Sequence, residues 1–213
     1  MTRVVVRRIT EVLAAAPAAA DWLSTSEQLR LLQLRVVERR QQYLAGHYLL
    51  RQLLAEHLGT DPRGITLVER LNLPPAVAHS PLQVSLSHAG DWLAAAWSAA
   101  PIGIDLEPRA RRPALDRLQH LLLNPDEAVD CLDNDALLQR WVLKEALLKR
   151  DHASALPQQL AALQLRPALH DAEIEILSTD SWHLALAPAG IVDVDLGLPL
   201  RARATWRRVG VDA

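Results

Sequence analysis

The sequence contains a single cysteine, Cys131, among its 213 residues. One cysteine cannot form an internal disulfide, and it cannot supply the several thiolates of a cysteine-based zinc site. The sequence also lacks a run of about 20 apolar residues, the length that a membrane-spanning helix needs. Residues 1–8 lack the apolar core of a signal peptide. We therefore expect a cytoplasmic protein with no membrane partner.

An excess of positive charge is also missing, because the formal net charge is −2. A chain that binds nucleic acid through its backbone phosphates usually carries a basic surface, so we expect no nucleic-acid partner. Half of the residues are apolar and 23% are charged, which is typical of a folded globular protein. The length allows one substantial core or two smaller lobes.

Lysine is nearly absent. Of the 23 lysine and arginine residues only two are lysine, Lys144 and Lys149, and they lie five positions apart. Arginine is a planar fork that keeps its proton, whereas lysine is a compact charge that can move protons and bind phosphate end-on. Keeping lysine only here indicates a site that needs lysine chemistry.

Two segments bring acidic side chains towards these lysines. Residues 103–107 alternate as a strand does, so Ile104 and Leu106 face inward while Asp105 and Glu107 share the other face. A helix is predicted to begin near 134, because six side chains from 138 to 149 recur at helical spacing: Leu138, Trp141, Val142, Glu145, Leu148 and Lys149. Three carboxylates and two ammonium groups therefore converge if the helix end meets the strand end.

The rest of the chain predicts an α+β fold. Expected helices cover 26–37 and 38–58, and expected strands cover 3–9, 84–88, 92–97, 174–177, 182–187 and 191–196. Residues 92–106 align with 182–196 without a gap, and residues 43–51 align with 141–149. We infer two similar halves, 1–107 and 108–213, related by a pseudo-twofold axis. Only the first-half strand and the second-half helix carry the full polar set, so we expect the site in the cleft between the halves.

The carboxylates of Asp105, Glu107 and Glu145 are hard oxygen ligands, which suit Mg²⁺ better than zinc or copper. Lysines beside such a metal favour a phosphate or pyrophosphate site, and His88 could donate to a phosphate oxygen. Each feature alone also has a plainer interpretation. An acidic strand face is usually solvated, and Glu145 and Lys149 are spaced as a surface ion pair.

Three motifs together resemble the signature of the 4'-phosphopantetheinyl transferases of the Sfp type. They are Ser87-His88, then Gly103-Ile104-Asp105-Leu106-Glu107, then Trp141-x-x-Lys144-Glu145-Ala146-x-x-Lys149. The resemblance implies Mg²⁺-dependent transfer of the phosphopantetheine arm of coenzyme A to a serine of an acyl carrier protein, or of a peptidyl or aryl carrier domain. It also implies that 3',5'-ADP is released, and that coenzyme A is a co-substrate.

The resemblance also implies roles for residues. Asp105, Glu107 and Glu145 would hold Mg²⁺, while Ser87, His88, Lys144 and Lys149 would contact the phosphates of coenzyme A. Glu127 would be the general base for the carrier serine, with Lys149 and Glu145 completing the catalytic set. Candidates for the 3'-phosphate are Arg39 and Arg40, with Arg51 on the same segment.

We expect a monomer whose carrier docks beside a basic loop containing Arg109, Arg111 and Arg112. Two other function classes stay open at this point. One is a catalytically degenerate member of the family that binds coenzyme A or a carrier without turnover. The other is a Mg²⁺-dependent nucleotide pyrophosphohydrolase, which would cleave its substrate with water and need no carrier.

Overall fold

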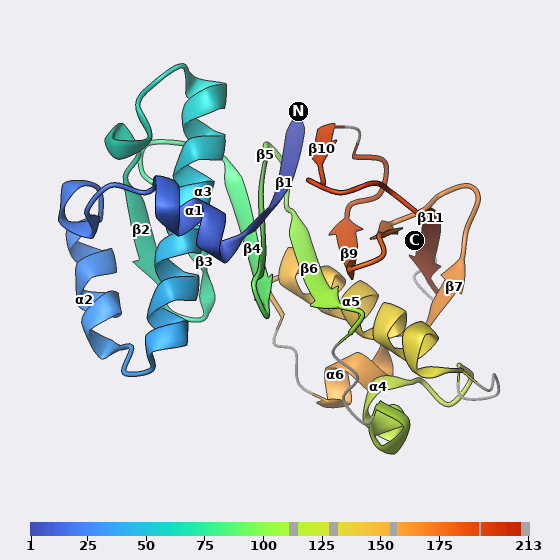
Figure 1. Cartoon of the computed structure of the whole chain (residues 1–213). Coiled ribbons are helices and arrows are strands. Elements are labelled where there is room, and N and C mark those ends of the chain that lie inside the picture. The colour runs from blue at the N-terminus through green and yellow to red at the C-terminus, as the bar shows by residue number, and fades with distance from the viewer. Residues whose placement is uncertain (111–114, 128–131, 154–156, 192, 210–213) are drawn as a thin grey trace. The chain divides into compact units, whose positions relative to one another are not determined.

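In the computed structural model of the chain (Figure 1), the described residues are 1–110, 115–127, 132–153, 157–191 and 193–209. Their contacts divide the chain into two compact units. The first unit is Met1–Ile102 with Val192–Gly197, and the second is Gly103–Ile191 with Leu198–Ala213. We expected a boundary after Glu107, and the contacts instead place Gly103–Glu107 in the second unit. The fold is mixed α+β, whereas the pseudo-twofold relation stays a prediction.

The first unit contains a four-stranded sheet and three α-helices. Its strands follow the order β10-β1-β5-β4, in which β10 runs parallel to β1 and the other pairs are antiparallel. A separate hairpin joins β2 and β3. The elements are β1 (Thr2–Arg8), α1 (Ile9–Ala15), α2 (Thr25–Gln33), α3 (Val37–Leu58), β2 (Leu67–Arg70), β3 (Leu73–Val77), β4 (Gln83–Ala89), β5 (Trp92–Ser98) and β10 (Asp193–Asp195), with short 3-10 turns at Ala19–Asp21 and Pro62–Gly64.

The core of the first unit lies between α3 and the sheet. Alternate residues of β5, Leu93, Ala95 and Trp97, belong to the same buried cluster as Leu50 and Leu54 of α3. Period 2 on the strand and period 3.6 on the helix each place these side chains on one face, so the two elements bury a shared apolar layer. The helix ends at Gly59, whose φ of 65° is the left-handed conformation that glycine adopts readily.

The second unit is built around a five-stranded sheet of order β6-β9-β8-β11-β7. Helix α5 covers its core, because Val142, Leu143, Ala146 and Leu147 pack with buried residues of β7, β8 and β9. The elements are β6 (Gly103–Pro108), a 3-10 turn at Leu115–Leu118, α4 (Gln119–Leu122), α5 (Asn134–Arg150), α6 (Pro157–Ala162), β7 (Leu165–Pro167), β8 (Ile174–Ser178), β9 (Trp182–Ala187) and β11 (Ala202–Arg208). None of the helices in the described ranges is both long and apolar enough to cross a membrane.

Most of the expected elements are confirmed, including β5, β6, β9 and the long helix α5. Strand β11 is absent from the expected strands, because four of the eight residues 201–208 are arginine and favour a basic surface segment. Ala202, Ala204 and Trp206 in fact alternate with polar residues there, and the segment pairs with β8 and β7. The helix expected over 26–37 ends earlier, at Gln33, and α3 begins at Val37.

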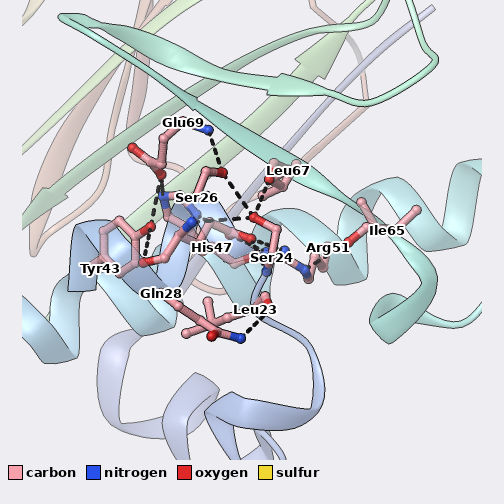
Figure 2. A network of polar contacts seen from close by, with 11 residues as sticks. Leu23, Ser24, Ser26, Gln28, Tyr43, His47, Arg51, Ile65, Leu67 and Glu69 are labelled. Carbon is pink, nitrogen blue, oxygen red and sulfur yellow. Dashed lines mark hydrogen bonds and ion pairs between the residues drawn. The ribbon is translucent and has the colours of Figure 1, made fainter. Parts of the chain in front are cut away.

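A buried polar network joins α2, α3 and the loop before β2 (Figure 2). The carboxylate of Glu27 accepts two hydrogen bonds from Arg51, at 2.7 and 2.5 Å, and lies 2.7 Å from Nδ1 of His47. Arg51 also donates to the carbonyl of Ile65, at 3.1 Å. Glu27 and Ser24 form the capping box that begins α2. One fully buried carboxylate therefore fixes a helix start, a helix face and a loop together.

The electrostatics of Glu27 favour the charged form. Burial alone would raise its pKa, but the hydrogen bonds from His47 and Arg51 and the charge of Arg51 lower it from 4.5 to about 2. Removing one member of such a buried pair leaves the other charge uncompensated, which typically costs about 3–5 kcal/mol.

We predict that acid destabilises the first unit through Glu27. A carboxylate whose pKa is lowered on folding contributes its stability above the unfolded pKa and loses it as the pH falls towards the folded pKa. For Glu27 this window runs from 4.5 down to about 2. Urea unfolding across the window should show a loss of about 3 kcal/mol from this group. Glu27→Gln should be less stable at pH 7 and should lose less on acidification.

Asp61→Asn is the matched control for Glu27→Gln. The pKa of Asp61 is also lowered to about 2, by Arg63. The side chains of both residues are exposed, however. Solvent screening makes such pairs nearly neutral for stability, so this variant should follow the wild-type profile. Parallel profiles for wild type and Glu27→Gln would contradict the account.

Candidate active site

The acidic side chains of β6 face helix α5. The pairing of β6 with β9 places Gly103 opposite Ala187 and Asp105 opposite Ala185. Both alanines belong to the buried cluster under α5, and directly opposite residues of an antiparallel pair share a face. Asp105 and Glu107 therefore lie on the α5 side of the sheet, where Asp105 is 3% exposed.

The backbones of α5 and β6 approach each other unusually closely at Gly103. A Cβ atom added there would lie 1.9 Å from the carbonyl oxygen of Ala146 and 2.4 Å from the backbone nitrogen of Arg150. Only glycine leaves room for this contact. As a consequence, the C-terminal half of α5 lies against the strand that carries Asp105, and both elements belong to one unit. The expected meeting of strand and helix thus occurs inside the second unit.

Asp105, Glu145 and Lys149 form the charged centre of this contact. The ammonium group of Lys149 donates to Oδ1 of Asp105 at 2.6 Å. Burial raises the pKa of Glu145, the negative charge of Asp105 raises it further, and the charge of Lys149 partly offsets this increase. The ammonium group of Lys149 is partly exposed and pairs with Asp105, and the charges of both residues act on Glu145.

These donors fit a hard divalent cation in their chemistry, because carboxylate oxygens are the ligands that Mg²⁺ takes in proteins. The protein supplies only part of the ligands that a metal needs. Within the described part of the chain, no three His, Cys, Asp or Glu side chains are grouped closely enough to hold a metal by themselves. Mg²⁺ usually keeps waters and substrate oxygens in its shell, so an incomplete protein set beside Lys149 suits a metal that arrives with a phosphorylated ligand.

Lys144 and Glu127 lie elsewhere, in the interior of the second unit. Lys144 is fully buried, and its ammonium group donates to Glu127 at 2.5 Å and to the carbonyl of Leu122 at 2.8 Å. Glu127 is 5% exposed and also accepts from the backbone nitrogens of Asn124 and Leu165. Burial lowers the pKa of Lys144, and Glu127 opposes that shift. The pair ties α5 to residues 122–127 and to the start of β7.

This burial does not favour two of the roles that the sequence predicts. A general base must reach the serine proton directly or through one water, and a phosphate ligand must present its ammonium group. Neither Glu127 nor Lys144 presents a free polar atom in this structure, because each is enclosed and bonded within the protein. Helical spacing predicts that the neighbours Lys144 and Glu145 point in different directions. It could not show that Lys144 is the one that faces the interior.

The remaining expected contacts to coenzyme A belong to the first unit. Ser87 and His88 are neighbours on β4, so their side chains point to opposite faces of the sheet. Arg39 is exposed, whereas Arg40 donates to the carbonyls of Leu31 and Leu34 at the end of α2. Arg51 is fully buried against Glu27, which removes it from the 3'-phosphate candidates.

The basic loop is also different from what we expected. Arg109 donates to both carboxylate oxygens of Asp135, at 3.0 and 3.3 Å, and to the carbonyl of Thr179 at 3.2 Å. Arg109 therefore links the end of β6 to α5 and to the residue after β8, in addition to carrying a surface charge. Arg111 and Arg112 lie outside the described residues. Sequence reasoning also missed Asp135 and His183, which are 3.0 Å apart between α5 and β9, because no pattern in the sequence pairs these two positions.

Part of this α+β chain is similar in sequence to two curated proteins. No protein-family model matches it. A 4'-phosphopantetheinyl transferase of Bacillus subtilis is 29% identical over 114 residues, which is 50% of each chain. The 4'-phosphopantetheinyl transferase psf-1 of Bacillus pumilus is 31% identical over 113 residues, 50% of this chain and 48% of that protein. The chain spans about half the length of the curated relatives it matches. These relatives support assigning the chain to the 4'-phosphopantetheinyl transferase family.

We predict opposite effects of the same substitution at two glycines. Gly103→Ala should force α5 away from β6 and destabilise the protein by about 1–3 kcal/mol. Gly46→Ala lies inside α3, where the new methyl group meets only ordinary contacts of 3.6 Å or more. It should leave stability unchanged or raise it by up to about 1 kcal/mol, because alanine is the better helix residue. Urea unfolding measures both. Equal effects would contradict the close approach at Gly103.

We predict that Lys144 stabilises the folded protein, because it compensates the charge of Glu127. Lys144→Met leaves the buried Glu127 carboxylate without its cation and should cost about 3–5 kcal/mol in the free energy of unfolding. The double variant Lys144→Met with Glu127→Gln should recover part of this loss, because the uncompensated charge is gone. Denaturation of the single and double variants measures the coupling. A stable Lys144→Met variant that has only lost coenzyme A affinity would show instead that Lys144 contacts the ligand.

Proposed function

We propose that the protein is a 4'-phosphopantetheinyl transferase that modifies a carrier protein. The observation that carries the proposal is the centre formed by Asp105, Glu145 and Lys149, in which two carboxylates and one ammonium group meet beside Gly103. A serine hydroxyl of the carrier attacks the phosphorus that bears the pantetheine arm. The new serine O–P bond forms, the P–O bond of the pyrophosphate breaks, and 3',5'-ADP leaves.

In this proposal Asp105, Glu107 and Glu145 hold Mg²⁺ when it is bound, and the metal supplies positive charge against the pyrophosphate. Lys149 contacts the phosphate oxygens and balances the charge that develops on the leaving group. Contacts of Ser87, His88 and Arg39 with the other phosphates of coenzyme A stay predictions from the sequence. Glu127 and Lys144 are left out of the chemical step, because both are enclosed. Because Glu145 binds the metal in this proposal, the serine proton leaves to solvent water.

The partner in this proposal is an acidic helical carrier domain. The similarity to the two named transferases supports it, as does the arginine-rich composition around β6. Arg109 is not one of the docking charges to vary, because reversing it would break its bonds to Asp135 and Thr179. A docking role for Arg111 and Arg112 stays a prediction.

The test is the intact mass of apo carrier proteins after incubation with the protein, coenzyme A and Mg²⁺. We expect a gain of one phosphopantetheine group that chelator abolishes. Lys149→Met should lower the rate about 10²- to 10³-fold, as loss of a charge-stabilising donor does, while Arg166→Met, which removes an exposed cation of the same unit, should not. Coenzyme A binding without mass gain on any carrier would favour a degenerate binding protein. Release of 3',5'-ADP with water alone would favour a pyrophosphohydrolase.

A further inference from the structure

A chain of hydrogen bonds runs through the second unit next to the charged centre. The hydroxyl of Ser178 on β8 lies 2.7 Å from Nδ1 of His183 on β9, and Nε2 of His183 lies 3.0 Å from Oδ1 of Asp135 on α5. Ser178 is 7% exposed and His183 is 1% exposed. Hydrolases use the same three residue types as a nucleophile triad, but a buried serine has no access to substrate. This series of hydrogen bonds therefore needs an explanation other than nucleophilic catalysis.

The direction of these bonds follows from their chemistry. Burial lowers the pKa of His183, although Asp135 opposes the shift, so the ring is neutral near pH 7. An ionised carboxylate only accepts hydrogen bonds. Nε2 therefore donates to Asp135, and Nδ1 accepts from the hydroxyl of Ser178. The ring bridges two strands and a helix without adding a charge of its own.

Asp135 is the point at which this chain meets β6. Its two carboxylate oxygens accept from Arg109, which follows directly after β6, and from Gln139 one turn further along α5. Burial would raise the pKa of Asp135, but His183 and Arg109 keep it below its usual value. An anion in the first turn of α5 is also favoured by the helix dipole.

Further bonds fix the end of β6 against the β8–β9 turn. The backbone nitrogen of Arg109 donates to Ser181 at 2.9 Å, and its side chain donates to the carbonyl of Thr179. The hydroxyl of Thr179 in turn accepts from the backbone nitrogens of Ser181 and Trp182. Asp135 and Thr179, which accept hydrogen bonds from Arg109, are therefore themselves hydrogen-bonded within the second unit.

The strand register connects this cluster to the proposed metal ligands. His183 stands directly opposite Glu107 in the β6–β9 pair, two positions along from the pairing of Ala185 with Asp105. Opposite residues share a face, so His183 and Glu107 both lie on the α5 side. One end of β6 is fixed by the backbone contact at Gly103, and the other by Arg109, Asp135 and His183. Asp105 and Glu107 lie between these two points.

We propose that His183, together with Ser178, Asp135 and Arg109, is a positioning residue that keeps Glu107 on the α5 side of β6, where it can join Asp105 and Glu145 around a divalent cation that arrives with a phosphorylated ligand. The inference rests on the proposed function for its link to catalysis, and on geometry for its link to cation binding. Outer partners that orient metal ligands typically change metal affinity or activity by about 10- to 100-fold when they are removed.

The test compares Mn²⁺ binding to purified protein, alone and with coenzyme A, from the electron paramagnetic resonance signal of free Mn²⁺. His183→Phe keeps a ring but loses both hydrogen bonds, and it should weaken Mn²⁺ binding about tenfold or more. His183→Gln keeps a donor towards Asp135 and should restore part of the affinity. Ser178→Ala keeps the bond from the ring to Asp135 and should give a smaller loss, which provides a second variant if His183→Phe does not fold.

Leu184→Val is the matched control, because it trims a fully buried side chain on the opposite face of the same strand. It should lower stability and leave Mn²⁺ binding unchanged. Equal losses for Leu184→Val and His183→Phe, unchanged Mn²⁺ binding in His183→Phe, or no Mn²⁺ binding by the wild type would overturn the positioning role.

Transfer assays on the same proteins separate the two proposals. If the wild type moves no phosphopantetheine to any carrier while the Mn²⁺ pattern holds, the proposed function fails and the positioning role stands. If the wild type transfers phosphopantetheine but all variants bind Mn²⁺ with the same affinity, the positioning role fails and the proposed function stands. If both hold, the Mg²⁺ concentration for half-maximal transfer should rise in His183→Phe, with the KM for carrier unchanged.

Discussion

The close backbone contact between α5 and β6 determines where the charged side chains of the second unit lie. With no Cβ at Gly103, the helix lies directly on the strand, so Lys149 reaches Asp105 and Glu145 comes under the influence of that carboxylate. Without this contact the same residues would form an acidic strand and a helix with an ordinary surface ion pair. The site therefore depends on a steric condition at a residue that carries no functional group.

The buried ion pairs of the two units differ in their energetics from this centre, in which only the ammonium group of Lys149 is partly exposed. Glu27 with Arg51, and Glu127 with Lys144, are enclosed and bonded on nearly all their polar atoms. Such pairs hold helices to loops, and breaking them leaves a charge without compensation. At the centre formed by Asp105, Glu145 and Lys149 the ammonium group is partly exposed. A partly exposed ammonium group can reach a phosphate oxygen of a ligand, which an enclosed pair cannot do.

Much of this arrangement could be predicted from sequence. Alternation in residues 103–107 predicted a strand with Asp105 and Glu107 on one face, and helical spacing predicted α5. The sequence could not show that β6 pairs with β9 in the second unit, because periodicity gives the face of a strand and says nothing about its neighbour. It could not show that Glu127 and Lys144 meet in the interior, or that His183 stands opposite Glu107, because both depend on tertiary register. The cluster of the only two lysines predicted that both serve the site. Composition could not show that Lys144 is buried against Glu127 while Lys149 pairs with Asp105.

The most direct measurement of the central claim is a crystal structure of the protein grown with coenzyme A and Mn²⁺, with an anomalous difference map for the metal. The account predicts one strong peak bonded by oxygens of Asp105, Glu107 and Glu145 and by the pyrophosphate, with Lys149 against the same phosphates. A metal bound away from β6, or a pyrophosphate that contacts Lys144 and leaves Lys149 paired only with Asp105, would contradict it.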